Sequence, residues 1–182
     1  ARGVDTIRKY AKTQLGKELS EDEAQRIYDV KARYFHEMPE AKVFDGVIDL
    51  MQKIKASGLK IGIVTGSAQL PLIERVTRDF GDFVSADQIT TAYDVKRGKP
   101  NPDPYLMGLQ KAGNYLPEEG IVVENAPLGV HAGAAAGCYT VAINRGPLAD
   151  SVLLNEGADI LFPTIREFAD YWKLFLNRFP KY

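Results

Sequence analysis

Short apolar runs alternate with amphipathic helical patterns from about residue 43 to the end of the sequence. The runs expected to form strands are 60–64, 88–91, 120–124, 140–143 and 159–162. The patterns expected to form helices are 46–57, 70–79, 104–112, 129–136, 151–156 and 165–179. Strands that alternate with helices are typical of parallel sheets, because a parallel connection needs a crossover. The sequence therefore predicts an α/β fold, a doubly wound parallel sheet with helices on both faces.

The segment before this region carries a different pattern. Apolar side chains recur there at spacings of three and four, which indicates two amphipathic helices. Ser20 and Glu23 have the spacing of a capping box that would start the second helix, and Pro39 would end it. We therefore predict a helical segment over residues 1–42 and an α/β core over residues 43–182.

Charge and composition limit the classes of function. The sequence has 23 basic and 24 acidic residues and a net charge of -1, so we expect no nucleic-acid partner. Its apolar runs are too short for a membrane span, so no membrane partner is expected. Cys138 is the single cysteine, which excludes a disulfide framework and favours a reducing, cytoplasmic location. We interpret Cys138 as a buried small apolar side chain, and His36 and His131 as structural or surface residues.

Three polar stretches follow expected strands or open expected helices. Because the carboxyl ends of parallel strands meet at one edge of a sheet, we expect these stretches to gather where open α/β folds bind ligands. The first stretch is Thr65-Gly66-Ser67, between the strand at 60–64 and the helix at 70–79. Free N–H groups at the start of that helix would attract an anion, although Thr-Gly-Ser is also ordinary turn chemistry.

The second stretch is the proline-rich loop 96–105. Its prolines restrict the backbone, and a helix is expected to begin near Pro104. Lys99 is thereby expected to be held in place. A fixed ammonium group is well suited to neutralising a phosphate, whereas a lysine in a flexible loop would only be solvated.

The third stretch begins where an apolar strand ends in Glu124 and Asn125. A carboxylate and an amide oxygen at a strand end are hard ligands of the kind that Mg²⁺ prefers. Asn125 also precedes an expected helix, so capping of that helix is an equally good interpretation of the residue.

The three stretches together resemble, in order and spacing, three signature motifs of haloacid dehalogenase (HAD) superfamily hydrolases. The segments that carry this resemblance are Thr65-Gly66-Ser67, Gly98-Lys99-Pro100-Asn101-Pro102-Asp103 and Glu124-Asn125-Ala126-Pro127-Leu128-Gly129. The string Lys-Pro-Asn-Pro-Asp-Pro-Tyr is similar to the β-phosphoglucomutase-like subfamily, which also holds small phosphatases. The resemblance covers essentially the whole chain. It implies a HAD Rossmann-like core, with residues 1–42 as part of a helical cap.

The resemblance implies an enzyme that transfers a phosphoryl group from a small phosphorylated metabolite through an aspartyl-phosphate, with Mg²⁺ as cofactor. Thr65 would be catalytic and, with the backbone of Gly66 and Ser67, would hold the phosphoryl oxygens. Lys99 would offset the charge on the nucleophile and the phosphate. Like the family's metal ligands, Glu124 and Asn125 would hold Mg²⁺ directly or through water.

The sequence departs from the family at the attacking aspartate. The family pattern is Asp-x-Asp after an apolar strand, and no Asp-x-Asp occurs in this sequence. Asp45 does not match that pattern, because Val47 stands two residues later and no apolar strand precedes it. We expect about fifty further residues before Ala1, which would carry the missing strand and its aspartate. Without them we expect the chain to fold poorly and to be inactive.

A second departure is Asn125, where the family more often has a carboxylate, so Mg²⁺ should be held less tightly. The resemblance leaves three functions as alternatives: a phosphatase or phosphomutase, a pyrophosphatase of the same fold, and a non-catalytic phosphate-binding or regulatory domain. An Asp-x-Asp upstream would separate the enzymes from the binding domain. Substrate choice depends on the cap, so neither the substrate nor the oligomeric state follows from the sequence.

Overall fold

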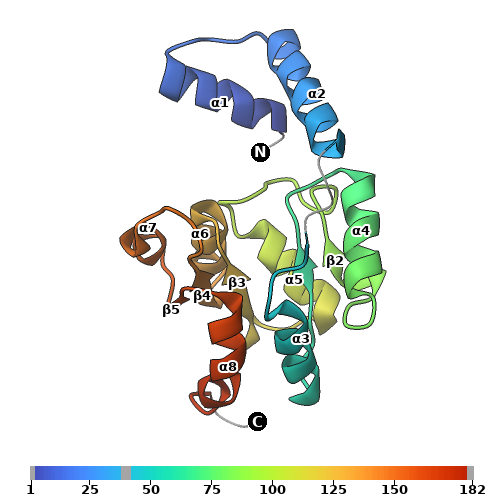
Figure 1. Ribbon diagram of the computed structural model, residues 1–182, viewed down its shortest axis with the longest axis vertical. Coiled ribbons are helices and arrows are strands. Elements are labelled where there is room, and N and C mark those ends of the chain that lie inside the picture. Colours follow the sequence, from blue (N-terminus) through green and yellow to red (C-terminus); the bar gives the residue numbers. More distant parts are fainter. Residues whose placement is uncertain (1–2, 38–41, 180–182) are drawn as a thin grey trace. The chain divides into compact units, whose positions relative to one another are not determined.

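The computed structural model describes residues 3–37 and 42–179, and its chain divides into two compact units, Ala1–Val43 and Phe44–Tyr182 (Figure 1). Each unit is described by itself. In the described ranges, no helix is both long and apolar enough to cross a membrane.

The first unit is a pair of helices, α1 (Gly3–Leu15) and α2 (Glu21–Glu37), which pack against each other. The predicted capping box is confirmed, because the Ser20 N–H donates to Glu23 Oε2 at 2.8 Å and the Glu23 N–H donates to Ser20 Oγ at 3.2 Å. Pro39, the expected end of the second helix, lies outside the described residues.

The described residues of the second unit form five strands, and every strand pair among them is parallel, as predicted. They form two sheets, in the orders β1-β2 and β3-β4-β5. The strands are β1 (Ile63–Val64), β2 (Ile89–Thr90), β3 (Ile121–Glu124), β4 (Tyr139–Ile143) and β5 (Ile160–Phe162). Among the described residues, β1 and β3 therefore each pair along one edge only.

A cavity of about 430 Å³ separates the segments that carry these two edges. Its walls include Ile61 and Val64 on the β1 side and Ile121 and Val123 on the β3 side, with Trp172 of the last helix. The strand predicted over 60–64 is shortened to two residues because its ladder reaches only from Ile63 to Val64. Its remaining residues line this cavity.

All six helices predicted for this unit are confirmed. They are α3 (Val47–Ala56), α4 (Leu70–Phe80), α5 (Asp103–Gly113), α6 (Pro127–Ala135), α7 (Asp150–Asn155) and α8 (Ile165–Leu176). Short 3₁₀ turns at Ala86–Gln88 and Pro117–Glu119 precede β2 and β3. The predicted extension of the last helix to residue 179 is wrong, because the helix ends at Leu176 and the chain continues in turns.

Apolar side chains pack on both faces of the larger sheet, as alternation along a strand requires. On one face, Val141 and Ile143 of β4 lie in a cluster with Phe168 of α8. On the other face, Ala142 packs with Val130 of α6. The aromatic side chains of the last helix therefore serve the core, as predicted. Cys138 is also buried, which confirms its interpretation as a small apolar side chain.

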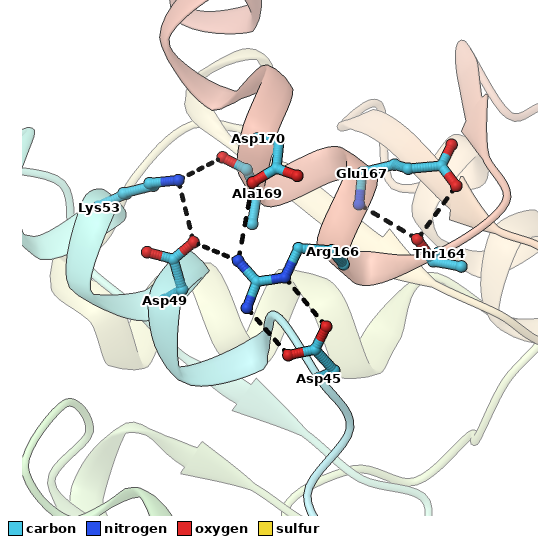
Figure 2. A network of polar contacts seen from close by, with 8 residues as sticks. All are labelled: Asp45, Asp49, Lys53, Thr164, Arg166, Glu167, Ala169 and Asp170. Atoms are coloured by element: carbon cyan, nitrogen blue, oxygen red, sulfur yellow. Dashed lines mark hydrogen bonds and ion pairs between the residues drawn. The ribbon is translucent and has the colours of Figure 1, made fainter.

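A polar network joins the start of α3 to α8 (Figure 2). Arg166 donates two hydrogen bonds of 3.0 Å to Asp45 and one of 2.7 Å to Asp49. Gly46 has φ +89°, and a β-carbon there would lie 2.6 Å from the Arg166 Cα. Only glycine fits at this close approach. Asp45 thus serves in the attachment of α3 to α8.

Candidate active site

The three predicted polar stretches meet at the carboxyl ends of β1 and β3. The ammonium of Lys99 lies 3.4 Å from the carbonyl oxygen of Val64, the last residue of β1. The same ammonium forms an ion pair with Oε1 of Glu124, the last residue of β3. Lys99 therefore bridges the ends of two strands from different sheets, next to Thr65.

The turn Thr65-Gly66-Ser67 is held by hydrogen bonds of its own. The Ser67 N–H donates to Thr65 Oγ1 at 3.1 Å, and the Gln69 N–H donates to Ser67 Oγ at 3.1 Å. Because Thr65 Oγ1 acts here as an acceptor, its hydroxyl hydrogen is left to be donated elsewhere. The helix α4 begins directly afterwards, at Leu70.

The loop that carries Lys99 is closed by a pair of side chains. Arg97 donates to both carboxylate oxygens of Asp103, at 2.9 and 2.7 Å, and Asn101 bonds through its backbone and side chain to the carbonyl of Gly98. The Lys99–Pro100 peptide is cis. These hydrogen bonds hold the loop together in addition to the prolines on which its expected rigidity is based.

Each oxygen of the Glu124 carboxylate accepts from two donors. Its Oε1 accepts from Lys99 and from the Tyr105 hydroxyl at 2.7 Å, and its Oε2 accepts from the N–H groups of Asn125 and Ala126 at 3.0 and 3.2 Å. Burial acts to raise the pKa of Glu124, but the Lys99 charge and these hydrogen bonds outweigh it, so the pKa lies below its ordinary value. Glu124 is therefore ionised at neutral pH.

Tyr105 is a site residue that our reading of the sequence missed. Burial, followed by the negative charge of Glu124, raises the pKa of Tyr105, so its hydroxyl remains a donor at neutral pH. The available signal was a tyrosine on the first turn of a helix that faces the core, because a buried hydroxyl needs a partner.

The fit of Mg²⁺ to this site depends on which oxygens can still accept. A carboxylate offers about four acceptor positions, and four donors occupy those of Glu124. Asn125 is exposed, so its amide oxygen can face a ligand. In the part of the chain that the structure describes, no group of three or more His, Cys, Asp or Glu residues could hold a metal ion. Asn125 therefore fits Mg²⁺ as a direct ligand, whereas Glu124 would bind the ion or one of its waters only in place of a donor that it now has.

His131 makes its polar contact away from this arrangement. His131 of α6 is exposed and pairs with Glu156 at 2.9 Å, as expected for a surface residue. The side chain of His36 lies outside the described residues.

Curated proteins of similar sequence are phosphatases. The chain is 41% identical over 111 residues to hexitol phosphatase A of Escherichia coli, a match that covers 61% of this chain and 49% of that protein. It is 31% identical over 122 residues to the phosphorylated carbohydrates phosphatase of Thermotoga maritima, with 66% of this chain and 54% of that protein covered. The chain thus spans about half the length of these curated relatives.

The chain is also similar to a solved structure. A candidate beta-phosphoglucomutase from Bacteroides vulgatus is 42% identical, with a TM-score of 0.87, and the match covers 98% of this chain and 72% of that one. Residues 3–137 match the sequence model of the haloacid dehalogenase-like hydrolase family. The match includes Thr65, Lys99 and Glu124 at the strand ends, and the chain belongs to the haloacid dehalogenase-like hydrolase family.

Proposed function

We propose that this chain supplies the phosphate-handling residues of an enzyme that acts on small phosphorylated carbohydrates, as a phosphatase or a phosphomutase. The position of Lys99 carries the proposal. Its ammonium lies between the end of β1 and the Glu124 carboxylate at the end of β3. A cation held there can neutralise a phosphate on the adjacent Thr65 turn and a carboxylate that attacks it.

The residues of the chain would act mainly by stabilising charge. The Thr65 hydroxyl and the backbone of Gly66 and Ser67 would donate hydrogen bonds to the phosphoryl oxygens, on which negative charge is spread during transfer. Lys99 would offset the remaining charge on phosphate and nucleophile. Positioned donors of this kind are most of what phosphoryl transfer requires of a protein.

We propose that the attacking aspartate comes from a strand seated in the cavity that β1 and β3 line. The sequence has no Asp-x-Asp, and Asp45 is already paired with Arg166. A parallel strand in the cavity would pair with both free edges and bring its end to the same edge as Lys99. Transfer would then proceed through an aspartyl-phosphate.

Magnesium is the cofactor we propose for this site. Bound there, Mg²⁺ would supply positive charge to the transferring phosphoryl group. Asn125 would hold it through its amide oxygen, and Glu124 would bind the ion or one of its waters in place of one of the four donors that now fill its acceptor positions. The other ligands would be waters, the substrate phosphate and the attacking carboxylate.

Similarity to the relatives favours a phosphorylated carbohydrate as substrate, since their names specify a hexitol phosphatase and a phosphatase of phosphorylated carbohydrates. We further propose that the unit of α1 and α2 is part of a cap that selects the substrate. In this fold the phosphate site is generic, so selection must come from residues outside it.

The proposal is tested by assaying phosphate release from hexitol phosphates, sugar phosphates, phosphoglycolate and pyrophosphate, with Mg²⁺ and with a chelator. Isomerised product without phosphate release would identify a mutase. The variant Thr65→Val removes one hydroxyl at nearly constant volume, and it should lower turnover about tenfold or more. Activity that Thr65→Val leaves unchanged would come from a contaminant or from another site.

The alternatives predict other outcomes of the same assay. A pyrophosphatase would release phosphate from pyrophosphate and leave the monoesters intact. A non-catalytic phosphate-binding domain would bind inorganic phosphate with the intact protein and turn over nothing. If an aspartyl-phosphate forms, denaturing the protein in acid after the reaction and measuring its mass would reveal an increase of one phosphoryl group.

A further inference from the structure

Tyr105 contacts both members of the ion pair at the candidate site. Its hydroxyl donates to Glu124 Oε1 at 2.7 Å, the same oxygen that Lys99 contacts. The Lys99 ammonium lies 4.8 Å from the centroid of the Tyr105 ring, within the range of a cation–π interaction. One buried side chain thus holds the carboxylate with its polar tip and faces the ammonium with its ring.

The shared oxygen matters for the charge of Lys99. When an ammonium is the only strong donor to a carboxylate oxygen, it experiences the full electrostatic attraction of that oxygen. A second donor on the same oxygen takes up part of the negative charge of Glu124, so the attraction on Lys99 weakens. The ammonium then retains more of its charge for a phosphate on the Thr65 turn.

We propose that Tyr105 is a positioning residue. Its hydroxyl and the Lys99 ammonium both donate to Glu124 Oε1, and this sharing keeps Lys99 available to phosphate. This inference rests on the proposed function and deepens it. Its consequence is specific: the hydroxyl should favour phosphate binding through Lys99 and disfavour metal binding through Glu124, because it occupies an acceptor position that a metal ion or its water could otherwise use.

The test uses the variant Tyr105→Phe, which keeps the ring and removes only the hydroxyl. Tyr93→Phe is the matched control, because the Tyr93 hydroxyl donates at 2.9 Å to the carbonyl of Ala68, beside the Thr65 turn, and not to the ion pair. The intact protein is titrated with inorganic phosphate and, separately, with Mn²⁺, which is followed directly by its electron paramagnetic resonance signal. Neither titration depends on turnover.

Tyr105→Phe should weaken phosphate binding by about threefold or more and tighten Mn²⁺ binding by a similar factor, while kcat falls by about tenfold. Tyr93→Phe should change each quantity by less than about twofold. Opposite shifts are the diagnostic result, because a general loss of structure would weaken the binding of both ligands. Phosphate and Mn²⁺ affinities that both stay unchanged, or that both fall, would overturn the assignment.

These measurements distinguish a failure of the proposed function from a failure of the positioning role of Tyr105. If the unaltered protein binds phosphate and Mn²⁺ but turns over no substrate, the proposed activity fails while opposite shifts in Tyr105→Phe still support the positioning role. If the unaltered protein binds neither ligand, the positioning role is overturned as well.

Discussion

Glu124 fills the space that a side chain on Gly129 would need. A β-carbon on Gly129 would lie 2.2 Å from both Cδ and Oε1 of Glu124, and 2.5 Å from Oε2. The first turn of α6 thus approaches the carboxylate closely, while the N–H groups of Asn125 and Ala126 bond to it from the preceding turn. The carboxylate can move away only by breaking these hydrogen bonds or its contact with Lys99.

The variant Gly129→Ala should therefore be destabilised and inactive. Alanine favours a helix over glycine by about 1 kcal/mol, but overpacking against a fixed group costs about 1–3 kcal/mol, so the net effect should be unfavourable. Gly146→Ala is the control, because no heavy atom lies within 4 Å of a β-carbon there. Chemical denaturation and phosphate release measure both. A Gly129→Ala protein as stable and active as Gly146→Ala would contradict the fixed position of Glu124.

The variant Lys99→Ala should lower turnover by roughly 10² or more, which corresponds to about 3 kcal/mol of transition-state stabilisation. Stability should also fall, because Glu124 would remain largely buried without its cation. The double variant Lys99→Ala with Glu124→Gln removes that unpaired charge, and it should recover part of the stability and none of the activity. Lys96→Ala, an exposed lysine in the same loop, is the control. Unchanged turnover in Lys99→Ala would remove Lys99 from the site.

Local sequence patterns were sufficient to predict most elements of the fold. The spacing of apolar residues predicted each helix of the second unit, because helix and strand periods are properties of neighbouring residues. The pair of Ser20 and Glu23 predicted a helix start for the same reason. Polar residues after apolar strands predicted that Lys99 and Glu124 would meet, because parallel strands end at one edge.

Other features depend on contacts between distant residues, so no local pattern reveals them. The hydrogen bond from Tyr105 to Glu124 depends on how α5 packs against β3. The close approach of Gly129 to Glu124 depends in the same way on the angle of α6. The break between the two sheets and the shortness of β1 depend on which strands pair, since among the described residues β1 pairs with β2 alone and β3 with β4 alone.

The stability of the protein should depend on pH through Asp94. Its carboxylate accepts from the backbone N–H of Thr91 at 2.7 Å and from Lys111 at 2.8 Å. Burial acts to raise the pKa of Asp94, but the hydrogen bonds from Lys111 and Thr91 outweigh it, and the pKa lies below its ordinary value. A lowered folded-state pKa means that this stabilisation is complete above the ordinary value of about 4 and is lost as the pH falls through the folded value.

The variant Asp94→Asn tests this dependence, because its amide does not titrate. The difference in unfolding free energy between the unaltered protein and Asp94→Asn should be largest near neutral pH and should shrink as the pH falls from about 5 toward 2. Denaturant titrations at several pH values measure it. A difference that is constant over this range would show that the Asp94 carboxylate gains nothing from Lys111 and Thr91.

The variant Arg166→Met should loosen the start of α3, because Arg166 bonds to Asp45 and Asp49 (Figure 2). These pairs are partly exposed, so hydrogen exchange of the backbone amide at Val47 should accelerate by only about two- to fivefold, and added salt should narrow the difference. Arg178→Met, on the turn after α8, is the control, since Arg178 contacts Tyr171 instead. Equal exchange in both variants would mean that packing alone holds α3 to α8.

The variant Asn125→Asp should tighten Mg²⁺ binding, since an anionic ligand attracts the ion more strongly than a neutral amide does. Asn125 is exposed, so the added carboxylate can be accommodated without burial of its charge. Glu124→Gln should weaken Mg²⁺ binding, because it removes a negative charge and disturbs the bonds to Lys99 and Tyr105. Asn155→Asp, which adds the same charge at the end of α7, is the control.

Turnover in Asn125→Asp need not follow the gain in Mg²⁺ affinity, because the new charge also repels the substrate. Pyrophosphate carries more negative charge than a sugar phosphate, so its turnover should fall more. Titrating activity against Mg²⁺ with both substrates in parallel separates the two effects, since the half-saturating Mg²⁺ concentration reports the metal and the maximal rate reports the repulsion. If neither Asn125→Asp nor Glu124→Gln moves the half-saturating concentration relative to Asn155→Asp, the metal binds elsewhere and the proposed ligand pair is wrong.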